Sequence, residues 1–90
     1  MKPFLSIITV CRNAEVGLRK TAASVLEHRQ AFEWIVVDGG SSDGSVEFLK
    51  GISDERLYFI SQSDDGIYDA MNRGAKLAKG EFVWFLNAGD

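Results

Sequence analysis

Four short apolar runs alternate with three segments of helical periodicity along this chain of 90 residues. The apolar runs are nearly continuous and rich in β-branched and aromatic residues, as strands covered on both faces should be; they occupy residues 4–10, 32–37, 57–60 and 82–86. Between them, residues 18–26, 45–50 and 67–78 are predicted to be helices. This strict alternation predicts an α/β fold, a Rossmann-like open sheet that is mostly parallel, with right-handed crossovers.

The ends and centres of these segments give more detailed predictions. Asn13 and Asp43 precede the first two helices and are of the residue types that cap helix N-termini. Gly80 follows the third helix and is predicted to be its C-capping glycine. Trp34 and Trp84 lie in the middle of predicted strands and are expected in the core. We find no repeat, low-complexity stretch or linker, so the chain is expected to form one unit.

Charge and composition exclude several classes of protein. The net charge of −3 and the pI near 5.0 argue against nucleic acid as a partner, because phosphate binding needs a basic face. No apolar run approaches the roughly 18 residues that span a bilayer, and the N-terminus has no cleavage signal of a secretion leader. The single cysteine, Cys11, permits no internal disulfide and is expected to be a small buried side chain. We therefore expect a cytoplasmic location, or one at the periphery of the inner face of the membrane.

Polar loops follow all four predicted strands, at residues 11–13, 38–43, 61–66 and 87–90. In a parallel sheet these loops meet at the carboxyl edge, where open α/β folds bind their ligands. Four such loops suit a nucleotide or another phosphorylated ligand. The sequence lacks both the G-x-G-x-x-G loop of dinucleotide-binding dehydrogenases and the G-x-x-x-x-G-K-[ST] loop of P-loop nucleotidases.

Two carboxylates at this edge are candidate ligand contacts. Asp38 directly follows an apolar run, where it is placed to accept a hydrogen bond from a base or a ribose. Without a glycine-rich cradle, a diphosphate needs another source of positive charge, and Mg²⁺ or Mn²⁺ held by a carboxylate is the usual one. Asp90 is the best placed carboxylate for that role. For both residues, an ordinary turn or capping role is the alternative.

Four ordered segments resemble the N-terminal, nucleotide-sugar-binding part of family 2 glycosyltransferases, above all bacterial members of the colanic-acid type. These segments read SIITVCRNAE at 6–15, WIVVDGGSSDG at 34–44, DGIYDAMNRG at 65–74 and KGEFVWFLNAGD at 79–90. Because the resemblance extends over essentially all of residues 1–90, the chain is expected to be the donor-binding half of a GT-A fold. It implies an inverting, metal-dependent glycosyltransferase of polysaccharide or exopolysaccharide biosynthesis. The implied partners are a UDP-sugar donor and a glycan or lipid-linked acceptor, with Mg²⁺ or Mn²⁺ as the cofactor.

The resemblance also assigns site residues. Arg12 stands where the family has an aromatic residue that stacks on uracil, and a guanidinium plane can stack in its place. Gly39 replaces the usual acidic neighbour of Asp38. Asn87 and a glycine replace two carboxylates of the metal motif, which leaves Asp90 as the expected metal ligand. The expected nucleotide-binding residues are Cys11, Arg12, Asn13, Glu15, Asp38, Gly39, Asp64, Gly66, Asn72, Arg73 and Asn87. The family's catalytic base lies downstream of the metal motif, so no catalytic residue is assigned, and these 90 residues alone are not expected to transfer sugar.

Three other interpretations stay open. The loss of two acidic positions near Asp90 fits a non-catalytic nucleotide-binding or regulatory module of the same fold. A flavodoxin-like or receiver-type signalling domain also alternates strand and helix, but it needs a fifth strand and, for a receiver, an acidic cluster and a late lysine. Finally, no helix is predicted after the strand at 82–86, so a homodimer that pairs two copies through this exposed sheet surface is the third possibility.

Overall fold

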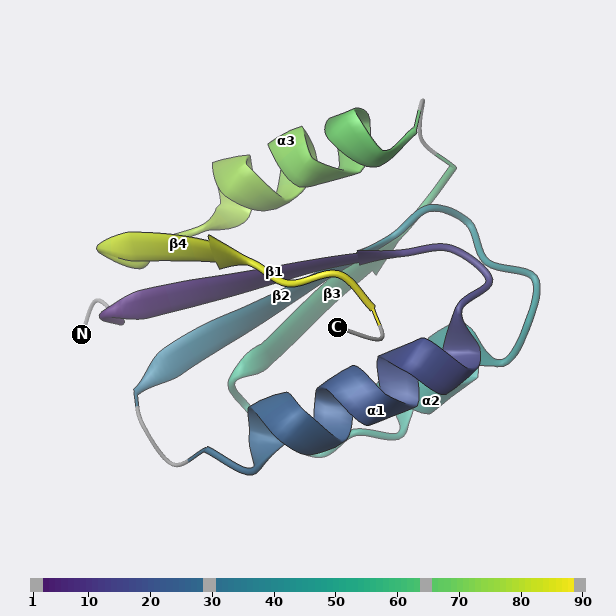
Figure 1. Cartoon of the computed structure of the whole chain (residues 1–90), viewed down its shortest axis with the longest axis horizontal. Helices are drawn as coiled ribbons and strands as arrows, with labels where there is room; N and C mark the ends of the chain where they lie inside the picture. Colours follow the sequence, from purple (N-terminus) through teal and green to yellow (C-terminus); the bar gives the residue numbers. More distant parts are fainter. Residues whose placement is uncertain (1–2, 29–30, 64–65, 89–90) are drawn as a thin grey trace.

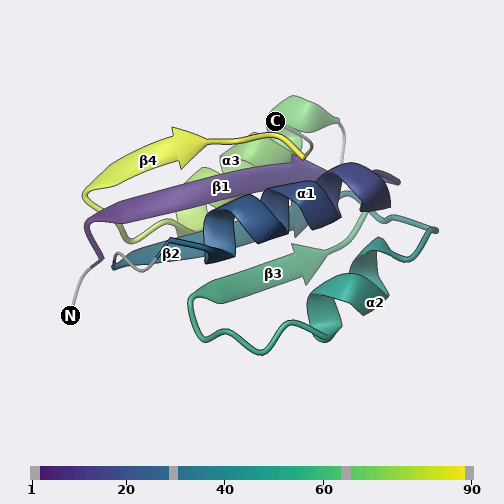
Figure 2. The ribbon, with the colours of Figure 1, turned by 60° about the horizontal axis from the view of Figure 1, so that its bottom comes forward.

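The computed structural model describes residues 3–28, 31–63 and 66–88. It has the predicted alternation of elements: β1 (Leu5–Cys11), α1 (Glu15–Leu26), β2 (Phe32–Asp38), α2 (Ser45–Lys50), β3 (Leu57–Ser61), α3 (Ile67–Leu77) and β4 (Phe82–Phe85). The strands form one sheet in the order β3-β2-β1-β4, and each neighbouring pair is parallel. The helices α1 and α2 lie on one face of the sheet and α3 on the other (Figures 1 and 2). The predicted α/β architecture is therefore confirmed.

Two apolar clusters form the core, one on each face of the sheet. Successive residues of a strand point to opposite faces, so Ile7 belongs to the cluster on the α1 face and Ile8 to the cluster on the α3 face. Trp34, on the α1 face, is completely buried, as predicted. Its indole Nε1 donates a hydrogen bond of 2.9 Å to Thr9 Oγ1, which satisfies the one polar atom of the ring.

Trp84 was expected in the core, and this prediction is wrong: 54% of the residue is exposed. Its strand, β4, lies at the edge of the sheet and pairs with β1, while the described helices pack mainly against β1 and β2. Phe82, Val83 and Phe85 are exposed for the same reason. Together with Phe4, whose ring centroid lies 5.0 Å from that of Phe82, these residues form an apolar edge.

All three predicted helix caps differ in detail. The N-cap residue of α1 is Ala14, because the backbone of Asn13 adopts a positive φ of 50° and its side chain bonds elsewhere. Gly44 is the N-cap residue of α2, one position after Asp43. The helix α3 ends with Ala78 in an extended conformation, so Gly80 is no C-cap. A Cβ atom on Gly80 would lie 2.6 Å from the Ser6 backbone nitrogen, so glycine is needed there for close approach to β1.

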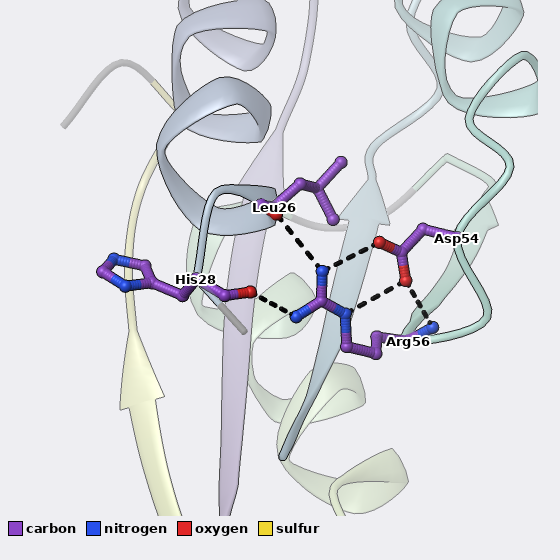
Figure 3. A network of polar contacts seen from close by, with 4 residues as sticks. All are labelled: Leu26, His28, Asp54 and Arg56. Carbon is purple, nitrogen blue, oxygen red and sulfur yellow. Dashed lines mark hydrogen bonds and ion pairs between the residues drawn. The ribbon is translucent and has the colours of Figure 1, made fainter. Parts of the chain in front are cut away.

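A network around Arg56 joins the end of α1 to the start of β3 (Figure 3). The guanidinium donates from Nη1 to the His28 carbonyl at 2.5 Å and from Nη2 to the Leu26 carbonyl at 3.2 Å, so it satisfies carbonyls that the helix itself leaves free. It forms an ion pair with Asp54 at 2.9 Å and lies 4.4 Å from the centroid of the Phe32 ring. These contacts fasten the amino end of β2.

Among the described residues, no helix is both long and apolar enough to cross a membrane.

Candidate functional site

The carboxyl ends of β1, β2 and β3 lie side by side, as expected for a parallel sheet (Figure 1). In the ladder, Cys11 pairs with Asp38, and Asp38 pairs with Ser61. Two further backbone bonds continue this pattern beyond the strands: the Gly39 N–H donates to the Cys11 carbonyl at 2.8 Å, and the Gln62 N–H donates to the Asp38 carbonyl at 3.0 Å. Four strand-end loops were predicted to meet at this edge, and the described residues show this for the ends of β1, β2 and β3.

Asp38 lies at the centre of these loops and is completely buried. Its Oδ2 atom accepts hydrogen bonds from the backbone nitrogens of Gly40 at 3.1 Å and Ser41 at 2.8 Å, and from the Ser61 hydroxyl at 2.7 Å. Its Oδ1 atom accepts from the Ser41 hydroxyl and, at 3.4 Å, from the Cys11 thiol. Because a carboxylate offers about four lone-pair sites, these contacts leave no free acceptor for a ligand.

The ionisation of this pair follows from its surroundings. Burial alone would raise the pKa of Asp38, but hydrogen bonds from Ser41, Ser61 and Cys11 to the charged form outweigh burial and hold the pKa below its usual range. For Cys11, burial and the neighbouring Asp38 charge raise the pKa of the thiol to about 12. The pair therefore consists of an ionised carboxylate and a neutral thiol at neutral pH.

A second set of hydrogen bonds joins the loop after β1 to the loop after β2. The Asn13 N–H donates to Ser41 Oγ at 2.8 Å, while Asn13 Oδ1 accepts from the Ser42 N–H at 2.7 Å. Glu15 takes part in a similar exchange, since its N–H donates to Asp43 Oδ2 at 3.2 Å.

In return, Glu15 Oε1 accepts a hydrogen bond of 3.0 Å from the Gly44 N–H. The other carboxylate oxygen of Glu15 forms an ion pair of 2.9 Å with Arg19. Asn13 and Glu15 therefore tie the two loops together through their side chains.

Gly40 allows the tight turn of the loop after β2. Its φ is 86°, a left-handed conformation that L side chains rarely adopt. An added Cβ would also lie 3.3 Å from the Ser63 backbone nitrogen. Gly66 has a φ of 116° at the start of α3, but an added Cβ would meet nothing within 4 Å there.

The remaining predicted residues lie around this network. Arg12 is exposed between Cys11 and Asn13, and within the described ranges its side chain has no hydrogen bond or ion pair. On α3, Asn72 is exposed, and Arg73 pairs with an aspartate of the same helix, Asp69, at 3.2 Å.

Arg73 Nη1 is buried, yet it has no hydrogen-bond partner in the part of the chain that the structure describes. Asn87 is exposed beyond β4. Asp64 and Asp90 lie outside the described residues.

Sequence reasoning missed two residues that hold the site together, Ser41 and Ser61. Serines in turns are common, and nothing in the local pattern distinguishes these two. A signal did exist for Ser61. It is a short polar residue at the end of β3, and it pairs with Asp38 because β2 and β3 are parallel neighbours. Finding it requires the strand order as well as the sequence.

The described carboxylates do not form a metal site. No group of three or more histidine, cysteine or acidic side chains within the described ranges is placed to hold a metal ion. Glu15, Asp38 and Asp43 all accept hydrogen bonds from backbone N–H groups of the chain around the site. These three carboxylates are therefore already engaged within the protein.

A cleft of about 640 Å³ lies at the opposite, amino edge of the sheet. Its lining includes Glu33, Arg56, Tyr58 and Lys79. None of the described residues that are predicted to bind nucleotide lines this cleft, so it is separate from that part of the candidate site.

Comparison with known proteins identifies the family of this chain. The family model described as "Glycosyl transferase family 2" matches residues 6–90. An uncharacterized glycosyltransferase of Mycobacterium tuberculosis is 42% identical in an alignment 90 positions long, which covers 98% of this chain and 34% of that protein. A PGL/p-HBAD biosynthesis glycosyltransferase of Mycobacterium bovis is 37% identical, over 98% of this chain and 36% of that protein. The chain thus spans about a third of the length of these relatives.

Solved structures have the same fold. Residues 1–349 of S. aureus TarS superpose with a TM-score of 0.86 at 26% identity, over 97% of this chain and 28% of that one. The mannosyltransferase PcManGT from Pyrobaculum calidifontis, in complex with GDP-Man and Mn²⁺, superposes with a TM-score of 0.84 over 99% of this chain and 28% of that one. Its 22% identity shows the fold alone. Since the family model covers nearly every residue, the chain belongs to glycosyl transferase family 2.

Proposed function

We propose that this chain binds the nucleotide-diphosphate sugar donor of an inverting glycosyltransferase. The transferase would act in polysaccharide biosynthesis, on a glycan or lipid-linked acceptor. The observation that carries the proposal is the carboxyl edge of the sheet, where hydrogen bonds hold the loops after β1 and β2 in place and Arg12, in the loop after β1, stays exposed. An exposed guanidinium on a fixed backbone suits both stacking on a base and attraction of a diphosphate.

UDP is the nucleotide that we propose. One solved TarS structure is in complex with UDP, and the PcManGT structure contains GDP-Man, so both uracil and guanine are found among proteins of this fold. Arg73 is a second candidate contact, because its buried Nη1 has no hydrogen-bond partner within the described residues. Asn72 and Asn87, both exposed, are proposed to donate hydrogen bonds to the donor.

The proposal includes Mg²⁺ or Mn²⁺, with Asp90 as its one proposed ligand in this chain. The other carboxylates near the site already accept hydrogen bonds from the protein, as described above. For the same reason none of Glu15, Asp38 and Asp43 is assigned as the general base. A sugar-transfer assay tests this point: turnover by these 90 residues with a UDP-sugar would show that a base is present among them.

Titration calorimetry with UDP and GDP, with and without Mn²⁺, tests donor binding. We expect UDP to bind, and Arg12→Ala to weaken it about tenfold, since one stacked or charge-assisted contact is worth roughly 1–2 kcal/mol. Lys20→Ala is the matched control, because Lys20 is an exposed cation of α1 without a hydrogen bond or ion pair among the described residues. Equal losses in both variants would contradict a specific role for Arg12.

The same titration examines the alternative of a non-catalytic nucleotide-binding module. The engaged carboxylates at the site favour this alternative. Binding of UDP that is unaffected by Mn²⁺ would support it, whereas binding that requires Mn²⁺ would support the transferase.

A homodimer through the apolar edge of β4 is a separate proposal. It is supported by the exposure of Trp84 and its neighbours, because exposed edge strands with apolar side chains pair readily with other chains. Size-exclusion chromatography coupled to light scattering should give a dimer for the protein and a monomer for Trp84→Lys. A monomer for both would contradict the proposal.

A further inference from the structure

The resemblance to family 2 glycosyltransferases suggests that Asp38 contacts the base or the ribose, but its surroundings in the structure point elsewhere. We propose that Asp38 is a positioning residue: its buried carboxylate fixes the loops after β1, β2 and β3 so that Arg12 faces the donor. This inference rests on the proposed function and deepens it, because it separates the residue that organises the site from the residue that meets the ligand.

The first argument is the number of donors around the carboxylate. Both oxygens accept hydrogen bonds from this chain, with backbone donors at 2.8 and 3.1 Å and a Ser61 hydroxyl at 2.7 Å. The residue is also completely buried. An incoming base or ribose would have to displace one of these donors and leave it unsatisfied, which costs more than the new contact returns.

The second argument is that the donors come from three separate segments of the chain. The Cys11 thiol belongs to the end of β1, the Ser41 N–H and hydroxyl to the loop after β2, and the Ser61 hydroxyl to the end of β3. A carboxylate that only contacts the ligand would need none of these donors, whereas a carboxylate that holds three segments together needs all of them.

The third argument is a relay from Asp38 to the residues that flank Arg12. The Ser41 hydroxyl donates to Asp38 and at the same time accepts from the Asn13 N–H at 2.8 Å. On the other side of Arg12, Cys11 donates its thiol to Asp38 at 3.4 Å. The backbone of Arg12 is thus held from both sides by groups bonded to one carboxylate.

Two variants separate the positioning role from a direct contact. Asp38→Asn places an NH₂ group where the carboxylate accepted hydrogen bonds, and Ser41→Ala breaks the relay but leaves the carboxylate in place. We expect each variant to lower the affinity for UDP and the affinity for CDP equally. The loss should be about tenfold for Asp38→Asn and a few-fold for Ser41→Ala. Ser53→Ala, a change at an exposed serine outside the site, is the control and should bind as the unmodified protein does.

A direct contact predicts a different pattern. Uracil carries a donor at N3 and cytosine an acceptor, so loss of a base-reading carboxylate would change the ratio of the UDP and CDP affinities. A change of that ratio of tenfold or more in Asp38→Asn, with Ser41→Ala unaffected, would overturn the proposal.

Hydrogen exchange tests the same proposal without a ligand. The Asn13 and Ser42 amides donate to Ser41 Oγ and Asn13 Oδ1, so both should exchange at least about tenfold faster in Asp38→Asn and Ser41→Ala. The amide of Val36, in the middle of β2, reports global unfolding and should change less. Unchanged protection at Asn13 and Ser42 would overturn the positioning role. If the unmodified protein binds no nucleotide, the proposed function fails, and the exchange rates still decide the role of Asp38.

Discussion

The strands β2 and β4 are alike in sequence and opposite in surroundings. Each is an apolar run with a central tryptophan, FEWIVVD in β2 and FVWF in β4. In β2, Trp34 is completely buried and its indole nitrogen is hydrogen-bonded, whereas Trp84 in β4 is 54% exposed. The difference shows that an apolar run predicts a strand, while its burial depends on its place in the sheet.

The two strands also differ at their ends. Arg56 lies over Phe32 at the amino end of β2, and the carboxylate of Asp38 holds the loops at its carboxyl end. The strand β4 pairs with β1 over four residues, from Phe82 to Phe85. A strand that is fastened at both ends and covered on both faces should contribute most of the stability.

Truncation of the two tryptophans should give the largest contrast. We expect Trp34→Ala to lower the free energy of unfolding by about 3–5 kcal/mol, the usual cost of removing a large buried aromatic ring. In the monomer, Trp84→Ala should cost less than about 1 kcal/mol, because 54% of the residue is exposed to water. Chemical denaturation monitored by circular dichroism measures both values.

If Trp34→Ala does not fold, Trp34→Phe and Trp84→Phe give the same comparison on a smaller scale. Equal losses at the two positions would show that β4 is covered in solution, as the proposed homodimer requires.

The hydrogen bond between Trp34 and Thr9 should have a smaller effect. Thr9→Val keeps the volume of the side chain but leaves the buried indole N–H without its acceptor, at a cost of about 1–3 kcal/mol. Adding Trp34→Phe removes the unsatisfied donor, so Thr9→Val should cost little in that background. A double-mutant cycle measured by denaturation gives the coupling; a coupling near zero would mean that the bond contributes nothing to stability.

The acid sensitivity of the Arg56 network should be the smallest effect. Hydrogen bonds from Arg56 lower the pKa of Asp54 from the ordinary value of 3.8 to about 2. Because the folded-state pKa is the lower one, the charged form stabilises the folded protein above about pH 4, and this contribution is lost as the pH falls toward 2.

Asp54→Asn should therefore make the melting temperature fall less steeply over that range than in the unmodified protein. The matched control is Glu47→Gln, since Glu47 is exposed and its ion pair with Lys50 is long, at 4.0 Å. If the melting temperature of Asp54→Asn falls with pH as steeply as that of the unmodified protein, the Arg56 network is not the cause of the acid sensitivity.

The sequence was sufficient for the fold and for the meeting of strand ends at one edge of the sheet. Strand and helix alternate clearly, and parallel strands necessarily bring Cys11, Asp38 and Ser61 to one edge. The sequence was not sufficient for the edge position of Trp84, because several strand orders are compatible with the same run of elements.

The roles of individual polar residues were also beyond the sequence. Asn13 is of a type that caps helices, yet its side chain bonds to Ser42, 29 residues away. The carboxylate of Asp38 is occupied by donors such as Cys11 and Ser61, 27 and 23 residues away. Partners at such separations are chosen by the fold, and no local pattern contains them.

The hydrogen bonds between the loops after β1 and β2 have a consequence for the thermodynamics of binding. Ordering one flexible residue costs roughly 1–2 kcal/mol in backbone entropy. In this chain most of that cost is part of the free energy of folding, since Asn13 and Glu15 already hold the loops without a ligand. Ligand association should therefore show a smaller entropic penalty than association with a disordered loop. Variants that loosen these loops should lose affinity mainly through a less favourable binding entropy.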